Sequence, residues 1–199
     1  MSMFTLLPSA DVAGKEETYA TWENGFSDSE IANLINYGDS QIFVDATVGN
    51  NAVAPNVRKT AVAWLAHNTE TNWLYDKLGY IVRQINGQFF NFDISGFAED
   101  FQYTVYKGQD QSFYDWHMDK AFTLNGSAPR KLSLIVQLSD PGEYEGGELQ
   151  FMTEAVPVEK PKTKGLVHIF PSWAMHRVTP VIRGTRKTLV VWVAGPKFR

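Results

Sequence analysis

FQYTVY, residues 101–106, opens a half of the chain in which the hydrophobic period is two. Short β-branched or aromatic runs separated by Gly, Pro, Asp and Asn are typical of half-buried strands. The later runs of this kind are KLSLIVQL (131–138), ELQF (148–151), GLVHIF (165–170) and KTLVVWV (187–193). The sequence therefore predicts a β domain in the carboxy-terminal half.

Two helices are predicted before that half. FSDSEIANLINYGD contains a capping box, because Glu30 follows Ser27 by three residues, and Gly38 is its expected end. TETNWLYDKLGYIVRQING carries an apolar stripe that Gly87 is expected to end. The stripe consists of Trp73, Leu74, Leu78, Ile81, Val82 and Ile85. Helices in one half and strands in the other favour a mainly β (α+β) fold, an antiparallel barrel or jelly roll with helical cladding, over alternating βαβ units.

The composition is that of one globular unit without a strongly charged face. The 199 residues are 44% hydrophobic and 14% aromatic, enough for one substantial core. The 22 acidic and 18 basic residues are well mixed, so nucleic acid is not an expected partner. The amino-terminal MSMFTLLPSADVAG lacks a basic leader, and no apolar stretch approaches about 18 residues. We expect a single domain over 1–199, with helix-rich support at 1–100 and a β core at 101–199, in the cytoplasm and away from membranes.

The candidate chemistry lies in histidine and carboxylate groups, because the chain has no cysteine. WHMDK supplies His117 and Asp119, and residues i and i+2 of an extended segment point to the same face. A third ligand from a distant strand would complete the two-histidine, one-carboxylate face of non-haem Fe(II) oxygenases, in which the opposite positions stay open. His176 and His168 are the candidates for this third position, whereas His67 is expected only to pack or cap.

Arg186 favours His176 over its rival. It follows His176 by ten residues and directly precedes the KTLVVWV run. Its planar guanidinium matches a carboxylate, so a buried Arg186 facing a metal site would bind the far end of a dicarboxylate. Alternation would then turn Thr188, Val190 and Trp192 to the same side, with Trp192 walling the site. At the surface, Arg186 would only make a salt bridge.

Two further stretches bear on access to such a site. GNNAVAPNVRKT (49–60) is polar and without period, which predicts a mobile loop serving as a plain connection or as a lid. The aromatic side chains of Tyr114, Trp116 and Trp173 flank the candidate ligands. They would either contact a substrate or pack between loop and barrel.

YKGQDQSFYDWHMD (106–119), APRKLSLIVQLSD followed by EGGELQF, and HRVTPVIRGTRKTLVVW (176–192) stand in this order in the chain. Together they resemble the iron(II)- and 2-oxoglutarate-dependent dioxygenases, most closely the prolyl 4-hydroxylase-like branch. The resemblance covers residues 101 to 195 approximately. It implies a distorted double-stranded β-helix, of the jelly-roll or cupin-like kind, with supporting amino-terminal helices.

The resemblance also implies a role for each matching residue. His117, Asp119 and His176 would ligate Fe(II). Arg186 would bind the distal carboxylate of 2-oxoglutarate, and Tyr106 would hydrogen-bond this co-substrate.

Two assignments within these segments stay open or are secondary. Tyr114 is the alternative to Tyr106 as the contact of 2-oxoglutarate. EGGEL is expected to form the hairpin between two barrel strands, which gives Glu145 and Glu148 a structural or solvated place rather than a catalytic one.

The implied reaction uses dioxygen to hydroxylate an unactivated carbon while 2-oxoglutarate is decarboxylated to succinate and carbon dioxide. A prolyl residue in a peptide or protein is the leading substrate, with free amino acids and other small molecules as alternatives. Two other classes fit the same ligands: a non-catalytic cupin-like metal-binding protein, and a non-oxidative metal-dependent isomerase or hydrolase on a jelly roll. Neither gives Arg186 a role, so Arg186 separates the hypotheses.

Overall fold

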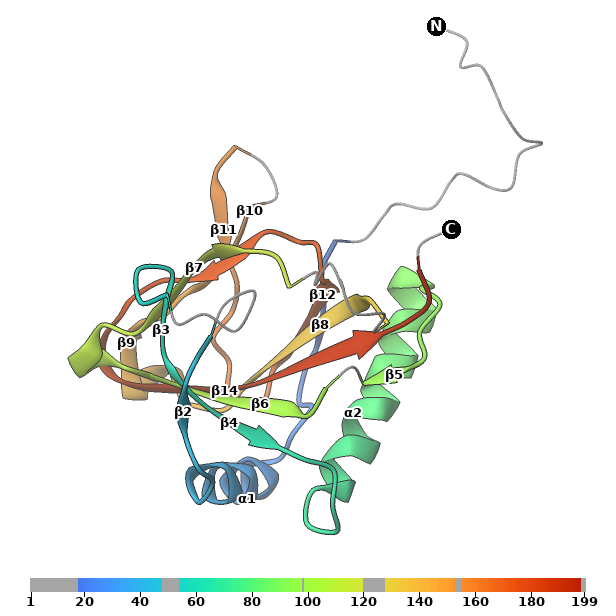
Figure 1. Cartoon of the computed structure of the whole chain (residues 1–199), viewed down its shortest axis with the longest axis horizontal. Coiled ribbons are helices and arrows are strands. Elements are labelled where there is room, and N and C mark those ends of the chain that lie inside the picture. The colour runs from blue at the N-terminus through green and yellow to red at the C-terminus, as the bar shows by residue number, and fades with distance from the viewer. Residues whose placement is uncertain (1–17, 48–53, 98, 120–127, 153–154, 198–199) are drawn as a thin grey trace, which may run out of the picture.

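Two antiparallel β-sheets form the body of the molecule, and two α-helices pack on the larger sheet (Figure 1). The computed structural model describes residues 18–47, 54–97, 99–119, 128–152 and 155–197. Within these residues the larger sheet has nine strands and the smaller sheet has five.

The elements have the following bounds. The helices are α1 Asp28–Asp39 and α2 Asn72–Ile85, which a π-helical turn, Asn86–Phe90, continues. The larger sheet contains β1 Ala20–Trp22, β2 Val44–Asp45, β4 Ala61–Leu65, β5 Gly96–Phe97, β6 Phe101–Lys107, β8 Arg130–Gln137, β9 Tyr144–Gly146, β12 Val167–Pro171 and β14 Val181–Ala194. Its order is β1-β12-β8-β14-β6-β4-β2, with β5 and β9 also paired to β14. The smaller sheet, in spatial order, contains β11 Pro157–Glu159, β10 Leu149–Met152, β13 His176–Val178, β7 Phe113–His117 and β3 Arg58–Lys59.

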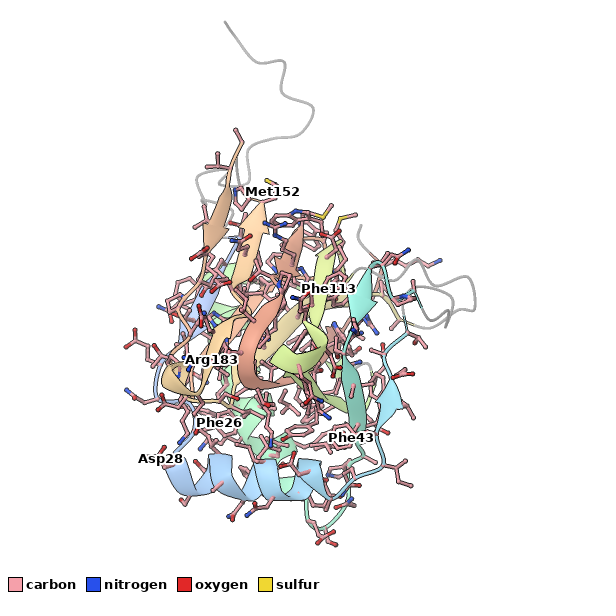
Figure 2. All side chains as sticks on the ribbon, turned by 90° about the vertical axis from the view of Figure 1, so that its left-hand side faces the viewer. Phe26, Asp28, Phe43, Phe113, Met152 and Arg183 are labelled. Atoms are coloured by element: carbon pink, nitrogen blue, oxygen red, sulfur yellow. The ribbon has the colours of Figure 1, made fainter. Side chains whose placement is uncertain are left out.

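Alternation along the strands of the larger sheet separates an apolar face from a polar one. Leu132, Leu134 and Val136 of β8 are fully buried in the cluster that also contains α1 and α2. Burying a side chain of this size stabilises the fold by about 1.5–3 kcal/mol, so this layer is the main core. Figure 2 shows α1 lying across one end of the sheets, with Asp28 in its first turn.

The opposite face of the larger sheet looks into the space between the sheets and is unusually polar. Buried polar groups require partners, so a face of this kind indicates a binding chamber rather than a second ordinary core. Its polar side chains, each at most 4% exposed, are Gln102, Thr104, Ser133, Gln137, His168, Arg186 and Thr188.

The two predicted helices are present, with one correction at an end. Ser27 and Glu30 form the capping box, and α1 ends one residue beyond Gly38. Gly87 does not end α2, because the π-helical turn runs through it. Asn86 closes that turn with its own side chain, which bonds both the N–H and the oxygen of Phe92 at 3.0 Å. Within the described residues, no helix is both long and apolar enough to cross a membrane.

The amino-terminal half contributes more than helices. Strands β1 to β5 come from it and extend both sheets, which the sequence did not predict. The predicted loop at 49–60 is wrong at its end, because Arg58–Lys59 form β3 and pair with β7. Arg58 is 7% exposed and reaches Gln102 in the chamber, which holds this strand in place. Residues 49–53, the first part of the stretch for which a lid is the alternative, lie outside the described residues.

EGGEL is not a hairpin between two paired strands. β9 pairs with β14 in the larger sheet, whereas β10 pairs with β11 and β13 in the smaller one. Gly146 and Gly147, both with positive φ, carry the chain from one sheet to the other. Glu145 is exposed beside Arg183, and Glu148 bonds Lys162 at 2.8 Å, so neither acidic residue lies at the site described next.

Candidate active site

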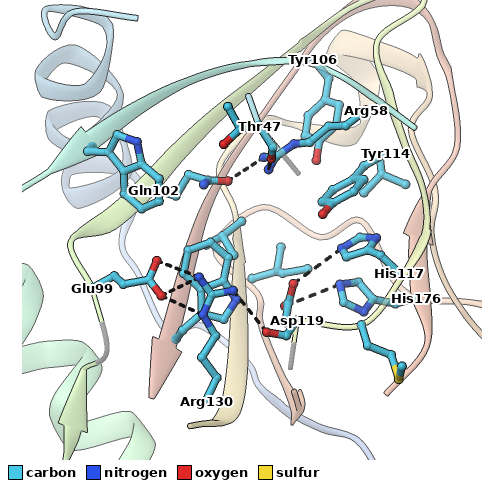
Figure 3. Close-up of a pocket in the computed structure, with 16 residues that line it drawn as sticks. Thr47, Arg58, Glu99, Gln102, Tyr106, Tyr114, His117, Asp119, Arg130 and His176 are labelled. Atoms are coloured by element: carbon cyan, nitrogen blue, oxygen red, sulfur yellow. Dashed lines mark hydrogen bonds and ion pairs between the residues drawn. The ribbon is translucent and has the colours of Figure 1, made fainter. Parts of the chain in front are cut away.

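His117, Asp119 and His176 converge between the two sheets (Figure 3). His117 ends β7, His176 begins β13, and the two are directly paired across the strands. Nε2 of His117 lies 3.6 Å from Oδ1 of Asp119, and Nε2 of His176 lies 3.7 Å from Oδ2. The side chains are 12%, 7% and 3% exposed in chain order. Residues 59 positions apart thus meet in a nearly dry cluster.

Both histidine rings are held with their metal-binding nitrogen free. Nδ1 of His117 is 2.7 Å from the backbone oxygen of Asp115, and Nδ1 of His176 is 2.9 Å from that of Ala174. A carbonyl oxygen can only accept, so Nδ1 carries a proton in each ring, and in the neutral ring Nε2 keeps its lone pair. The backbone therefore fixes the tautomer that a metal requires.

The electrostatics of the cluster suit a divalent cation. Burial, followed by the neighbouring His176, lowers the pKa of His117 to about 3, so its ring is neutral at neutral pH. Oδ2 of Asp119 is buried without a hydrogen-bond partner among the described residues. A buried carboxylate beside a neutral His117 ring favours a bound cation, and a metal ion held by the three side chains would supply the positive charge. These residues fit Fe(II).

A β-bulge sets the surroundings of the cluster. Positions 176 and 178 of β13 pair with 117 and 114 of β7, so two residues of β7 lie opposite one of β13. A bulge redirects side chains, and this one brings Tyr114 to the same side as His117. Their rings stack with centroids 3.4 Å apart.

Arg186 faces the same chamber from β14 and is 1% exposed. It pairs across the strands with Tyr106 of β6, and its Cζ lies 5.1 Å from the centre of the Tyr106 ring. Nη2 donates to Oε1 of Gln137 at 3.2 Å. Nε and Nη1 are buried and have no partner among the described residues. A guanidinium with unused donors in a dry chamber fits a carboxylate ligand.

A cavity of about 260 Å³ opens beside the triad and is lined by all three of its members. Its aromatic wall comes from Trp64, Tyr106, Tyr114 and Trp192. Tyr106 and Tyr114 thus both line the cavity, the first next to Arg186 and the second on His117.

The sequence missed the charged rim of this cavity. Arg58 donates to Oε1 of Gln102 at 2.6 Å and stands 4.5 Å from the Tyr114 ring centre. Arg130 pairs with Glu99 at 2.5 Å and stacks its guanidinium 3.8 Å from the Trp192 ring centre. Arg130 belongs to the APRK segment, in which nothing marks it as a site residue, and Arg58 belongs to the stretch predicted to be a loop. No local pattern distinguishes such arginines from solvated ones.

Two of the three aromatic residues expected at the substrate do not line the cavity. Trp116 lies under Arg177, whose Cζ is 4.6 Å from its ring centre, because the bulge turns it away from Tyr114. Trp173 is 38% exposed and packs on Phe92. These two contacts correspond to the packing alternative for Trp116 and Trp173.

The other histidines lie apart from the triad. His67 bonds Oδ1 of Asn72 at 2.8 Å beside the start of α2. His168 is fully buried in β12 and bonds Tyr19 and Gln137 instead of joining the ligand cluster.

Comparison with known proteins gives matches in sequence and in fold. The family model of the 2OG-Fe(II) oxygenase superfamily matches residues 101–194. A PKHD-type hydroxylase from Synechococcus sp. (strain CC9605) is 40% identical over 81 residues, which are 40% of this chain and 36% of that protein. The chain therefore spans little more than a third of the length of this relative.

Solved structures share the fold over most of the chain. A prolyl hydroxylase from Trichoplax adhaerens, in complex with a hypoxia inducible factor oxygen degradation domain peptide fragment, has a TM-score of 0.73 at 18% identity and covers 89% of this chain and 84% of its own. A prolyl-4-hydroxylase from Pseudomonas putida has a TM-score of 0.71 at 18% identity, with 89% and 92% covered. The double-stranded β-helix expected from the sequence is confirmed. Residues 101–194 are thus similar in sequence to the 2OG-Fe(II) oxygenase superfamily, and the chain shares the fold of the prolyl hydroxylase structures.

Proposed function

We propose that this protein is an Fe(II)- and 2-oxoglutarate-dependent dioxygenase that hydroxylates an unactivated carbon of a peptide or protein, with a prolyl residue as the target. One observation carries the proposal. A His-Asp-His cluster lies between the two sheets, and Arg186, buried on the inner face of the larger sheet, has Nε and Nη1 without a partner among the described residues.

The side chains divide the work as follows. His117, Asp119 and His176 would hold Fe(II), and Arg186 would hold the distal carboxylate of 2-oxoglutarate. Tyr106, beside Arg186, is the proposed hydroxyl contact to this co-substrate. When bound, Fe(II) supplies the redox chemistry: one oxygen atom of O₂ enters a C–H bond of the substrate and the other enters succinate, with release of CO₂.

The protein's own contribution is positioning and exclusion of water. Four aromatic side chains, Trp64, Tyr106, Tyr114 and Trp192, form part of the cavity wall and would limit the access of water to the reacting atoms. Because iron must remain ferrous, we also propose a reducing compartment such as the cytoplasm.

The cavity rim supports a peptide substrate. Arg58 lines the cavity with its Nε unpartnered among the described residues, a donor that suits a backbone carbonyl oxygen, and Trp64 and Tyr114 supply aromatic surface for an apolar ring. The similar structure from Trichoplax adhaerens holds a peptide fragment, and its name is that of a prolyl hydroxylase. Free amino acids are the alternative substrate class, because their carboxylates could bind the same hydrogen-bond donors.

Arg186 disfavours the non-oxidative alternatives. A structural metal site, an isomerase or a hydrolase gives the buried Arg186 no anionic partner. An uncompensated buried charge costs several kcal/mol. A dicarboxylate co-substrate removes this cost.

The test is a spectroscopic titration of the protein with Fe(II) and then 2-oxoglutarate under strict anaerobiosis. We expect a visible charge-transfer band in the wild type and its loss in His176→Ala. In Arg186→Ala the band should require about 100-fold more 2-oxoglutarate, because a buried charged hydrogen bond is lost. Arg183→Ala is the matched control, since Arg183 lies on the same strand with its side chain 79% exposed.

Tight metal binding without a charge-transfer band would contradict the proposal and would favour a structural or non-oxidative metal site. A band that responds equally to loss of Arg183 and of Arg186 would exclude the co-substrate role of Arg186.

The prolyl target has its own test. Peptides that contain proline, matched peptides with alanine in its place, and free amino acids are incubated aerobically with the iron-loaded protein, and succinate is measured. We expect succinate to rise only with proline-containing peptides, whose proline gains the mass of one oxygen atom. Stimulation by the alanine peptides or by free amino acids would redirect the substrate assignment and leave the dioxygenase reaction in place.

A further inference from the structure

Four side chains form a continuous hydrogen-bonded chain behind Arg186. Gln137 of β8 accepts from Nη2 of Arg186 at 3.2 Å, and its Nε2 lies 3.3 Å from Nε2 of His168 on β12. Nδ1 of His168 lies 2.6 Å from the hydroxyl of Tyr19. Arg186, Gln137 and His168 are each at most 2% exposed. The chain runs across neighbouring strands of the larger sheet, in the order β14, β8, β12.

The chemistry of each group gives this chain a single direction. A guanidinium can only donate, so the Gln137 side chain must turn its oxygen to Arg186 and its NH₂ to His168. Nε2 of His168 must then carry a lone pair, which places the proton on Nδ1, where the Tyr19 oxygen accepts it. Arg186 therefore sets the tautomer of the His168 ring, although the two side chains are connected only through Gln137.

His168 has no place in the proposed chemistry and is nonetheless fully buried among polar groups. A protonated ring would direct an N–H at the Gln137 NH₂ group and add a positive charge near Arg186. Burial, and after it Arg186, lowers the pKa of His168 to about 3, so the ring is neutral. In the neutral ring, Nε2 is an acceptor that fixes the Gln137 amide.

We propose that His168 and Gln137 are positioning residues that hold Arg186 with its free donors directed at the distal carboxylate of 2-oxoglutarate. This inference rests on the proposed function. One end of the guanidinium is anchored by Gln137, whose rotation is prevented by His168, and Nε and Nη1 remain free for the ligand. Preorganisation of this kind strengthens binding because the ligand need not order the arginine itself.

The test compares three substitutions of His168 by calorimetric titration of 2-oxoglutarate into the Mn(II)-loaded protein, together with the Mn(II) affinity of each variant. His168→Gln places a side-chain oxygen near the position of Nε2, where it can accept from Gln137. His168→Asn is shorter and places its amide near Nδ1, where it reaches Tyr19 only. His168→Phe fills the space without any acceptor.

We expect the Kd of 2-oxoglutarate to rise about tenfold in His168→Phe and in His168→Asn, and to stay within about threefold of the wild type in His168→Gln. The Kd of Mn(II) should be unchanged in all three. A role in packing alone would make the apolar Phe variant the best tolerated and would not separate Gln from Asn.

Two results would overturn the inference, and they are distinguishable from each other. Equal 2-oxoglutarate affinity in His168→Gln and His168→Asn removes the positioning role while the dioxygenase site stands. Failure of the wild type itself to bind 2-oxoglutarate with Mn(II) present removes the proposed function and the inference with it.

Discussion

At the residue scale, the hydrogen-bond partner of each buried histidine decides its chemistry. His117 and His176 donate from Nδ1 to backbone oxygens and present a free Nε2 to Asp119. His168 is fully buried, but its Nε2 faces the side-chain amide of Gln137. Residue type alone therefore does not identify a ligand, and the second nitrogen of the ring does.

His168 predicts a pH dependence of stability. Arg186 and Lys160 add to burial in lowering its pKa to about 3, the backbone of Pro161 opposes them, and Tyr19 stays neutral because burial raises its own pKa. The unfolded chain binds a proton at this residue near pH 6.5, and the folded chain does not, so stability is lost as pH falls through that value. Between pH 7.5 and 5.0 this contribution is about 2 kcal/mol.

The measurement is urea unfolding at both pH values. The loss of unfolding free energy on acidification should be smaller by about 2 kcal/mol in His168→Gln than in the wild type. His67→Gln is the control, because His67 is exposed and should retain the wild-type difference. The same loss in His168→Gln and wild type would rule out His168 as the group responsible.

At the element scale, two irregularities shape the site more than the regular strands do. The bulge between β7 and β13 stacks Tyr114 on His117 and sends Trp116 outside. The turn between β9 and β10 brings Gly147 against the stem of Arg186, where an added Cβ would lie 2.9 Å from Cδ. Both features move side chains that the period-two pattern alone would place differently.

Gly147→Ala should weaken both the fold and the binding of 2-oxoglutarate. Its φ of +65° is unfavourable for a residue with a Cβ by roughly 1–2 kcal/mol, and the new methyl group would displace Arg186. We expect a lower midpoint of thermal unfolding and a Kd for 2-oxoglutarate raised several-fold in the Mn(II)-loaded protein. Gly142→Ala is the matched control, since its nearest contact is an Asp140 side-chain oxygen at 3.4 Å. Unchanged 2-oxoglutarate affinity in Gly147→Ala would show that Arg186 tolerates the displacement.

At the scale of the whole molecule, the metal should act as a clamp between β7 and β13. Its proposed ligands lie on two strands of the smaller sheet and on the segment after β7, so binding favours the folded chain over the unfolded one. At Mn(II) about 100-fold above its Kd, the free energy of unfolding should rise by about 2.7 kcal/mol and return to its starting value with a chelator.

Denaturant unfolding with and without Mn(II) checks this. His176→Ala should lose most of the increase, and His67→Ala, which removes a histidine outside the cluster, should keep it. An equal increase in both variants would indicate that Mn(II) binds elsewhere.

The sequence by itself determined the elements whose signals are local. Capping of α1 by Ser27, the apolar stripe of α2 and the alternation of β8 and β14 depend on neighbours within a few residues. His176 and Arg186 also lie within one stretch of chain, and for this reason the third candidate ligand and the arginine could be proposed together.

Only the tertiary structure decided the shape and lining of the chamber. Arg58 comes from a strand of the amino-terminal half that forms by pairing with β7. The hydrogen bonds that link Tyr19, His168, Gln137 and Arg186 join residues up to 167 positions apart in the sequence. Such contacts depend on which strands become neighbours and on bulges that shift the register. No local periodicity encodes them, because they arise from the packing of two sheets built from distant segments.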